Sequence, residues 1–348
     1  MNYLKNYLLI LLVVVISGFG DAKAVSPVDN EPVPASDRVI IAYVFRNQQA
    51  LPDPTLMTHI NYAFGHVNNT FDGVRINSEE RLRELVKLKQ INPDLKILIS
   101  IGGWGSGRFS EMAMDSTLRA KFVADCIRVY KEFGLDGVDL DWEYPTSGMA
   151  KISAHPDDTK NFTLLMKELR EALGEGPLLT LATAANAKYI DFKGIDPYID
   201  FVNVMTYDMG VPPKHHSALF RSPIASYITG DEAMKAHEAA GVPKHKLVMG
   251  MPFYGKTAKD FPRVKWHEYN TLPADEYTEQ WDDVAKVPYL VDSEGKLVSG
   301  FENPRSLAIK CEYLIKNGYK GAMYWEYFED NESRDLSRAV FNGVFEKK

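Results

Sequence analysis

The chain has 348 residues, of which 45% are hydrophobic, and it carries a formal net charge of −7. This length allows a large core, in two domains or in a single α/β barrel with insertions. The acidic balance, without a long basic run, argues against nucleic acid as a main partner. Two cysteines, Cys126 and Cys311, cannot form a disulfide framework, and we expect both to be free and buried on helices.

The N-terminus has the pattern of a secretory signal. A charged start at Lys5 precedes an apolar run over residues 7–16 and the small-residue pattern Ala22-Lys23-Ala24. We predict a signal peptide over residues 1–24, export to the periplasm or the extracellular space, and no membrane contact after cleavage. The alternative is an uncleaved anchor helix, but the apolar run is short for a membrane span. Residues 25–37, with three prolines among small and acidic residues, are predicted to form a flexible leader.

Short apolar, β-branched runs recur along the rest of the chain, with helical patterns between them. The predicted strands cover residues 39–44, 59–64, 95–101, 137–141, 178–183, 201–206, 246–251 and 321–325. The predicted helices cover residues 78–89 and 116–133, each behind a serine cap, and residues 159–173, 230–240 and 306–317. Alternating strands and helices indicate a parallel sheet. Eight such units predict a (β/α)8 TIM barrel over residues 38–348.

The gap before the last predicted strand is too long for one helix and its loops. We therefore expect a small insertion between strands seven and eight, at about residues 256–300. Its aromatic residues could wall one side of a cleft. They are Trp266, Tyr269, Tyr277, Trp281 and Tyr289.

The fourth predicted strand ends in a cluster of acids. Alternate side chains of a strand share a face, so Asp139, Asp141 and Glu143 should line up. Crowded carboxylates cannot all be ionised cheaply, and we expect the cluster to hold at least one proton near neutrality. This favours proton transfer. A divalent-metal site is the alternative, but the flanking motifs give no reason for a metal, and we expect neither metal nor cofactor. Asp136 is expected to bond nearby backbone groups.

These strand ends resemble those of the chitinases of glycoside hydrolase family 18. The acid run resembles that family's D-x-x-D-x-D-x-E signature with its W-E-Y-P ending. Ser100-Ile-Gly-Gly-Trp104 is similar to the S-x-G-G motif, and Met205-Thr-Tyr-Asp208 to the M-x-Y-D motif. Gly250-Met-Pro-Phe-Tyr-Gly255 and Trp325 also fit. The resemblance covers about residues 38–330.

The resemblance implies four catalytic residues. Glu143 would be the general acid, and Asp141 would orient the N-acetyl group of the substrate. Asp139 would exchange a proton with Asp141, and Tyr207 would hydrogen-bond the acetamide oxygen. The expected substrate-binding or supporting residues are Tyr43 and Ser100, which would hold the aspartate pair, Asp208, the floor residue Trp325, and the subsite walls Trp104 and Tyr254.

The implied function is a secreted chitinase that cleaves β-1,4 links in chitin or N-acetylglucosamine oligosaccharides. Net retention would follow from attack by the substrate's own acetamide group. The alternatives are an endo-β-N-acetylglucosaminidase that acts on glycoprotein glycans and a non-catalytic sugar-binding protein. The stretch after Asp208 departs from the family pattern, because residues 209–213 lack the aromatic residue often found there. His215 and His216, further along this loop, are expected to be solvated.

Overall fold

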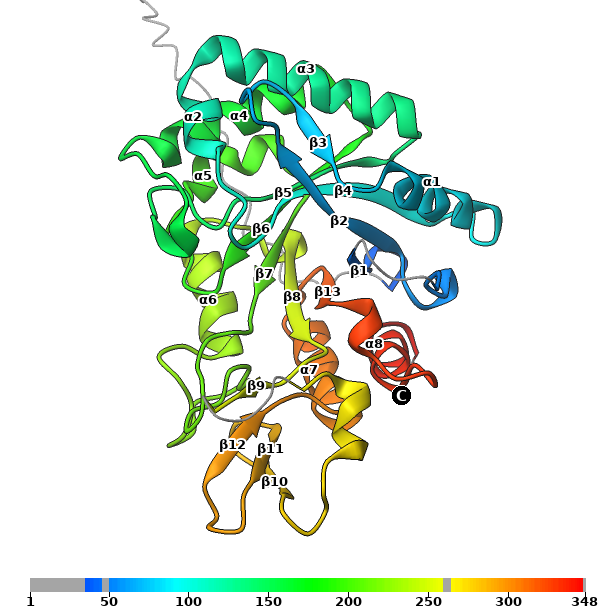
Figure 1. The fold of residues 1–348 in the computed structure, drawn as a ribbon, viewed down its shortest axis with the longest axis vertical. Helices are drawn as coiled ribbons and strands as arrows, with labels where there is room; N and C mark the ends of the chain where they lie inside the picture. The colour runs from blue at the N-terminus through cyan, green and yellow to red at the C-terminus, as the bar shows by residue number, and fades with distance from the viewer. Residues whose placement is uncertain (1–34, 46–49, 259–263, 347–348) are drawn as a thin grey trace, which may run out of the picture. The chain divides into compact units, whose positions relative to one another are not determined.

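The computed structural model describes residues 35–45, 50–258 and 264–346, and eight of its strands form a closed parallel barrel (Figure 1). The barrel strands are β1 (Val39–Phe45), β2 (His59–Val67), β4 (Lys96–Gly102), β5 (Gly137–Asp141), β6 (Leu178–Ala184), β7 (Phe201–Met205), β8 (Leu247–Pro252) and β13 (Gly321–Trp325). They pair in the order β1-β13-β8-β7-β6-β5-β4-β2, and a further β1–β2 pairing closes the ring. The predicted TIM barrel is confirmed, and each predicted strand coincides with one of these eight.

The predicted signal peptide, residues 1–24, lies outside the described residues, as do residues 25–34 of the predicted leader. Its last residues, Ala35–Asp37, form a 3-10 helix before β1. None of the helices in the described ranges combines the length and the apolar character that a bilayer crossing needs.

Helices cover the outside of the barrel (Figure 1). They are α1 (Glu79–Lys87), α2 (Phe109–Met114), α3 (Ser116–Phe133), α4 (Asp158–Leu173), α5 (Phe192–Ile195), α6 (Gly230–Ala240), α7 (Pro304–Lys316) and α8 (Asp335–Phe345). Ser78 caps α1 as predicted, but the predicted Ser116 cap of α3 is wrong by one residue. The carboxylate of Asp115 accepts the free N–H groups there, as a strong N-cap does. Helices α2, α5 and α8 were not predicted, and the first two are too short to show a clear periodicity.

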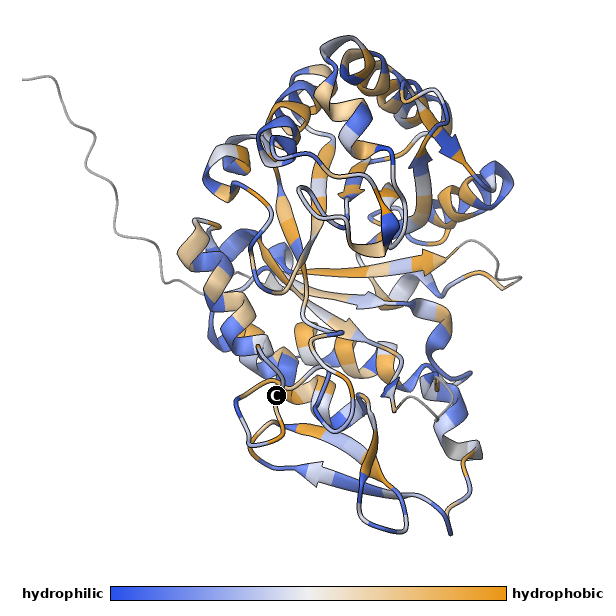
Figure 2. Cartoon of the chain, turned by 60° about the vertical axis from the view of Figure 1, so that its left-hand side comes forward, coloured by the Kyte–Doolittle hydropathy of each residue, from blue (hydrophilic) through white to orange (hydrophobic). Residues whose placement is uncertain are grey.

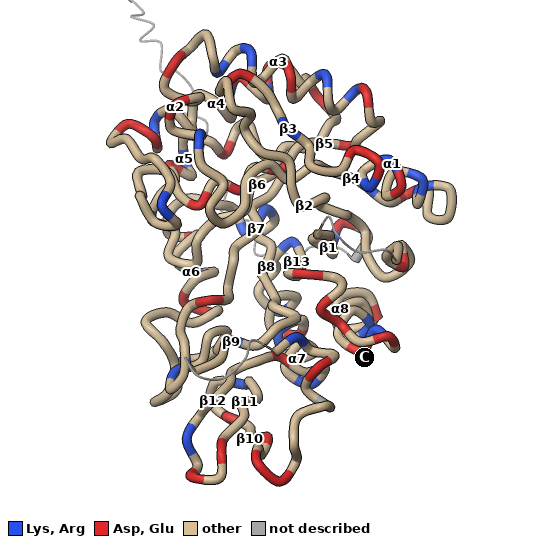
Figure 3. Tube along the Cα trace, viewed as in Figure 1, with Lys and Arg blue, Asp and Glu red and all other residues tan. Residues whose placement is uncertain are grey.

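Both faces of the barrel strands are buried. Along β1, even-numbered residues such as Ile40 pack toward the helices, whereas odd-numbered residues such as Tyr43 pack inside the barrel. Figure 2 accordingly shows the strands largely orange and the helices mixed in blue and orange. The outer helices α1 and α3 carry interspersed acidic and basic residues (Figure 3). Both cysteines are free and buried on helices, as predicted.

Two features are added to the eight-stranded barrel, one within its sheet and one as a separate sheet. The short strand β3 (Val74–Ile76) pairs antiparallel with β2 and was not predicted. Between β8 and β13, a second antiparallel sheet consists of β9 (Lys256–Thr257), β10 (Thr278–Asp282), β11 (Val287–Val291) and β12 (Leu297–Gly300). Three aromatic residues of this insertion, Trp266, Tyr269 and Tyr277, pack in the cluster of Phe301, and Tyr269 stacks on Phe301 with ring centroids 4.1 Å apart. Tyr289 packs against His215 of the loop after β7 instead.

A buried ion pair connects α7 to the loop after β7. Lys310 and Glu302 are both fully buried and in contact. The Lys310 ammonium also donates to the Ser217 carbonyl at 2.6 Å, and the Ser217 hydroxyl donates to Glu302 at 2.5 Å. Removing one member would leave a charge buried without its partner. The pair therefore fixes the path of this loop, which begins at the barrel mouth.

Candidate active site

The carboxyl ends of the barrel strands surround a cavity of about 890 Å³. Eight of the predicted site residues line it: Tyr43, Trp104, Asp141, Glu143, Tyr207, Asp208, Tyr254 and Trp325. The other two, Ser100 and Asp139, are fully buried and do not line the cavity. Side chains from distant parts of the chain thus meet at the end of the barrel where TIM-barrel active sites lie.

Asp139 is held inside the barrel by hydrogen bonds from its neighbours. Its Oδ2 accepts from the Tyr43 hydroxyl at 2.9 Å and the Ser100 hydroxyl at 2.7 Å. Its Oδ1 accepts from the Thr180 hydroxyl at 2.6 Å and the Asn203 amide at 3.3 Å. Burial raises the pKa of Asp139, and these donors oppose the rise because they favour the ionised form. The surroundings therefore suit a carboxylate that exchanges a proton.

The register of the barrel explains this arrangement. Ser100 pairs with Asp139 across β4 and β5, and Asp139 pairs with Thr180 across β5 and β6. All three side chains therefore point into the barrel at the same level. No group of three or more His, Cys, Asp or Glu side chains in the described ranges is arranged to hold a metal ion.

Asp141 and Glu143 have strongly perturbed acidities. Burial raises the pKa of Asp141 well above its usual range, and the nearby charges of Glu143 and Asp139 raise it further. Burial also raises the pKa of Glu143 to about 7; a hydrogen bond from Tyr144 opposes this rise, and the negative charge of Asp208 adds to it. Glu143 can therefore hold a proton near neutral pH and release it during a reaction.

Asp208 is the fixed anion of the cavity. Its Oδ1 accepts from the Tyr254 hydroxyl at 2.7 Å, and its Oδ2 lies 3.1 Å from the Lys256 ammonium. The His216 ring lies 3.7 Å from Oδ1. Burial alone would raise the pKa of Asp208, but His216, Lys256 and Tyr254 together hold it well below its usual range. An ionised Asp208 in turn helps Glu143 to keep its proton.

Two glycines let the end of β4 approach the acid strand. Gly102 has a φ of +133°, and a Cβ there would lie 2.0 Å from the carbonyl oxygen of Asp141. Gly103 has a φ of +90°, and its Cβ would lie 2.6 Å from the Phe64 ring. The Gly103 N–H donates to the same Asp141 carbonyl at 2.8 Å. Only glycine fits both positions.

Aromatic rings flank the cavity on both sides. Trp325 stacks on Phe64 with centroids 5.4 Å apart and planes 16° apart. Next to Glu143, Tyr144 stacks on Tyr189 at 4.9 Å and 7°. Such rings present apolar faces that match the C–H faces of sugars. The cavity thus combines a neutral acid, a fixed anion and stacking surfaces, which suits hydrolysis of a glycosidic bond.

Comparison with known proteins agrees with this chemistry. Residues 39–330 match the family model of the glycosyl hydrolases family 18. The chain belongs to glycoside hydrolase family 18. One family 18 structure similar to it is an N-acetylglucosaminidase from Paenibacillus barengoltzii, with a TM-score of 0.81 and 35% identity, covering 88% of this chain and 99% of that one.

Two curated relatives are chitinases by name. Chitinase A1 from Niallia circulans is 34% identical over 297 residues, which is 72% of this chain and 42% of that protein. Chitinase 1 from Aphanocladium album is 28% identical over 340 residues, 87% of this chain and 78% of that protein. The matched part of this chain thus spans less than half the length of the Niallia protein and most of the Aphanocladium protein.

Several residues of this family 18 site were not predicted. Thr180 and Asn203 both donate to Asp139, and the available signal was a polar residue within an otherwise apolar strand run. Lys256, the partner of Asp208, directly follows the predicted Tyr254-Gly255 segment. Tyr189 follows β6 at the same face of the barrel. For Lys256 and Tyr189, sequence position alone gives no reason to single them out.

The prediction for the histidines of the loop after β7 is wrong, and the aromatic residues of the insertion in the described ranges do not line the cavity. His215 and His216 are buried, each only 1% exposed; His215 contacts Asp282 at 3.0 Å. The insertion contributes its first residues to the cavity wall, but Trp281 lies under the Arg305 guanidinium at 3.8 Å and does not line the cavity. By contrast, the prediction that Asp136 bonds nearby backbone groups is confirmed. Its carboxylate accepts the backbone N–H of Ile97 at 2.7 Å.

Proposed function

We propose that the protein is a chitinase that hydrolyses β-1,4 links between N-acetylglucosamine units with retention of configuration. The observation that carries this proposal is the state of Glu143, a half-buried acid with a pKa of about 7 in an aromatic-walled cavity. A general acid at neutral pH requires such a raised pKa. The two relatives named as chitinases support the choice of substrate.

In the first step, Glu143 gives its proton to the glycosidic oxygen while the bond from that oxygen to the anomeric carbon breaks. Most retaining glycosidases use a second carboxylate, about 5 to 5.5 Å from the acid, as nucleophile. Here Asp139, Asp141 and Glu143 come from one strand end, and Asp208 is engaged by Lys256. The 2-acetamido oxygen of the substrate therefore attacks the anomeric carbon and forms an oxazolinium ion, as in the family 18 exception to the two-carboxylate rule.

In the second step, water attacks the anomeric carbon and opens the oxazolinium ring. The ionised Glu143 takes the proton of the attacking water and returns to its neutral form. Because two inversions occur at the same carbon, the product keeps the configuration of the substrate. The reacting sugar must therefore carry an N-acetyl group, and this requirement selects the substrate.

Asp141 and Asp139 stabilise the positive charge that forms between these steps. Burial and the charges of Glu143 and Asp139 raise the pKa of Asp141, which favours its protonated form in the free enzyme. Asp139 accepts hydrogen bonds from four neighbours and can take this proton as the sugar becomes positively charged. Asp141 is then an anion that accepts the acetamide N–H and faces the oxazolinium ring.

The remaining site residues bind the sugar. Tyr207 donates its hydroxyl proton to the acetamide oxygen, and burial raises its pKa well above the usual range, so the hydroxyl stays protonated. Asp208 contacts the same sugar, and Trp325 forms the floor beneath it. Trp104, 61% exposed, and Tyr254 are walls for neighbouring rings.

Hydrolysis of defined oligomers tests the proposal. Purified protein is incubated with N-acetylglucosamine oligomers of four to six units, and the products and their anomeric form are followed by NMR. We expect β-anomers as first products, and a loss of about 10²- to 10⁴-fold in kcat for Glu143→Gln. The matched control is Glu171→Gln, an exposed glutamate on α4. Intact oligomers after prolonged incubation, or equal cleavage of a ligand whose reacting ring carries a hydroxyl in place of the acetamide, would refute the proposal.

A second candidate is N-acetylglucosaminidase activity. The Paenibacillus barengoltzii structure, at 35% identity over 99% of that chain, favours it. Release of single N-acetylglucosamine residues as the first product from a tetramer would select this activity, whereas disaccharides would select a chitinase. Release of glycans from a high-mannose glycoprotein would select the endo-β-N-acetylglucosaminidase.

We also propose that residues 1–24 are removed as a signal peptide during export. The charged start, the short apolar run and the pattern Ala22-Lys23-Ala24 support this. Cleavage would place the leader, residues 25–37, at the N-terminus, ahead of the catalytic barrel, residues 38–348, with its insertion at about 256–300. N-terminal sequencing of the exported protein should begin at Val25, and an intact Met1 would contradict the proposal.

A further inference from the structure

Tyr227 is an exposed aromatic residue at the cavity that the proposed chemistry does not use. Its side chain is 67% exposed, yet it belongs to the cavity lining. It lies near the end of the loop between β7 and α6, the same loop that begins with Tyr207 and Asp208. The residues directly after Asp208 offer no aromatic ring, and Val211 stands there exposed. The far end of the loop thus adds a second ring to the one that Tyr207 presents at its start.

Tyr227 continues a series of rings that starts at the acid. Tyr144 follows Glu143, hydrogen-bonds it, and stacks on Tyr189 at 4.9 Å. Tyr189 and Tyr227 line the same cavity. Burial raises the pKa of the Tyr227 phenol, and the nearby Tyr189 adds to the rise. The Tyr189 hydroxyl also contacts the Met149 sulfur at 3.9 Å. From Tyr144 to Tyr227, the rings lead from the reacting centre toward solvent.

The strand order places this series on one side of the barrel mouth. In the closed ring, β5, β6 and β7 lie opposite β13, β1 and β2. Trp325 and Phe64, which stack together, belong to the second group, whereas Tyr189 and Tyr227 follow strands of the first. Glu143 must reach the oxygen that joins the cleaved sugar to its leaving group. With the reacting sugar on Trp325, as proposed above, the leaving part of the substrate lies beyond Glu143, on the side of Tyr189 and Tyr227.

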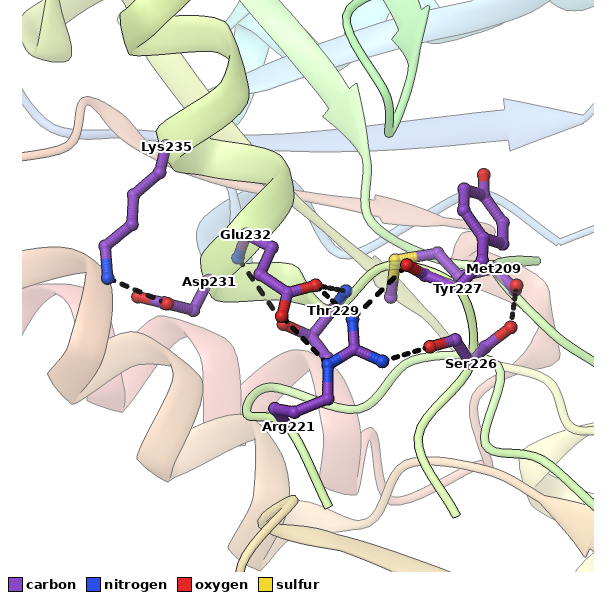
Figure 4. Close-up of polar contacts among 8 residues, drawn as sticks. All are labelled: Met209, Arg221, Ser226, Tyr227, Thr229, Asp231, Glu232 and Lys235. Carbon is purple, nitrogen blue, oxygen red and sulfur yellow. Dashed lines mark hydrogen bonds and ion pairs between the residues drawn. The ribbon is translucent and has the colours of Figure 1, made fainter. Parts of the chain in front are cut away.

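Arg221 fixes the backbone that carries the ring (Figure 4). Its Nε donates to the Glu232 carboxylate at 2.9 Å, and Nη2 contacts that carboxylate as well. Nη1 donates to the carbonyl of Ser226, and Nη2 to the carbonyl of Tyr227 at 3.3 Å. The Ser226 hydroxyl donates to the carbonyl of Met209, at the start of the loop. One guanidinium thus ties the loop end to the first turn of α6.

We infer that Tyr227 is the outer wall of a binding site for an N-acetylglucosamine ring on the leaving side of the cleaved bond, and that Arg221 is a positioning residue for it. The inference rests on the proposed function and names the part of the substrate that this side of the cavity holds. An exposed tyrosine has a free ring face on which the C–H face of a sugar can stack. Oligomers that extend past the cleaved bond gain this contact, and short substrates do not.

Substrates of two kinds separate this contact from the chemistry. The hexamer of N-acetylglucosamine has sugars on both sides of the bond, whereas a 4-nitrophenyl di-N-acetylchitobioside has an aryl leaving group. For Tyr227→Ala, we expect kcat/KM on the hexamer to fall about 3- to 10-fold more than on the aryl substrate, mainly through KM. Tyr227→Phe should keep the wild-type ratio of kcat/KM on the hexamer to kcat/KM on the aryl substrate. The matched control is Ile91→Ala, an equally exposed apolar side chain outside the cavity. An unchanged ratio in Tyr227→Ala would overturn the inference.

A double-mutant cycle tests the positioning by Arg221. Arg221→Ala should raise KM for the hexamer as Tyr227→Ala does, and should add nothing in the Tyr227→Ala background. The control is Lys235→Ala, which removes another ion pair on α6, the one with Asp231 at 2.8 Å (Figure 4). This variant should leave the ratio of kcat/KM on the hexamer to kcat/KM on the aryl substrate unchanged. Additive effects of Arg221→Ala and Tyr227→Ala would overturn the positioning.

The same measurements distinguish a failure of the proposed function from a failure of the inference about Tyr227. If the wild-type protein cleaves neither substrate, the chitinase proposal is wrong, and the binding of the hexamer, measured by calorimetry, decides the inference. Weaker binding by Tyr227→Ala than by wild type would then support the sugar contact. Equal affinity of the two proteins, or no binding by either, would overturn it.

Discussion

The pH dependence of hydrolysis should report the proton on Glu143. The acid must be protonated to act, so kcat/KM should fall as pH rises through the pKa of about 7 and drop about tenfold per pH unit above it. Two neighbours shift this pKa in opposite directions. Tyr144 lowers it through a hydrogen bond that favours the ionised form, and Asp208 raises it through its negative charge.

Tyr144→Phe should therefore raise the pH at which kcat/KM begins to fall, which is the alkaline limb of the pH profile. A hydrogen bond to a charged group contributes about 1.5 to 3 kcal/mol, and one pKa unit corresponds to about 1.4 kcal/mol. Because Glu143 and Tyr144 are only partly buried, we expect the lower end of this range, a rise of about one pH unit. The phenyl ring keeps the stack on Tyr189, so the site should remain in place.

Asp208→Asn should move the same limb to lower pH. The shift should be less than about one unit, because the Asp208 side chain is 47% exposed and its charge is screened by solvent. The assay is kcat/KM on the aryl chitobioside between pH 5 and 9. Tyr130→Phe on α3, outside the cavity, serves as the control. A wild-type limb near the ordinary pKa of a glutamate, or shifts of the same sign in both variants, would refute the reasoning.

Three further substitutions test the supporting structure. Lys310→Met removes one member of the fully buried ion pair Lys310–Glu302 and should lower the free energy of unfolding by about 3 to 5 kcal/mol, measured by urea denaturation. An unchanged free energy of unfolding would contradict this. Thr180→Val deletes a 2.6 Å hydrogen bond that favours the ionised form of Asp139. Asp139 should then hold a proton before the reaction starts and be unable to accept the one from Asp141, so kcat should fall about 10-fold or more while KM changes little. An unchanged kcat would show that this bond is dispensable. Gly102→Ala places a Cβ 2.0 Å from the Asp141 carbonyl oxygen at the end of β5 and should abolish activity and lower Tm. The control is Gly105→Ala, which has open space around it and should lower the free energy of unfolding by only about 1 to 2 kcal/mol. Equal Tm values for the two variants would refute the steric argument.

The sequence alone determined the barrel and the place of its acids, because both are local patterns. Each barrel strand is a short apolar run between turn or helix signals, and alternation of such runs with helical patterns leaves few topologies. The spacing of Asp139, Asp141 and Glu143 places them at one strand end, where crowding predicts a held proton. The raised pKa of Asp141 and of Glu143 agrees with that expectation. The helix cap at Ser116 was misplaced because Asp115 next to it is an equally good cap.

Only the tertiary structure decided which distant groups surround those acids. Thr180 donates to Asp139 because closure of the barrel sets the register of β5 against β6, and no local window of sequence contains that register. The ion pair of Lys256 with Asp208 and the clamp of Arg221 on the carbonyl of Tyr227 depend likewise on the paths of the loops. Burial and neighbouring charge act through space, so the acidity of each group is fixed only when the whole chain has folded.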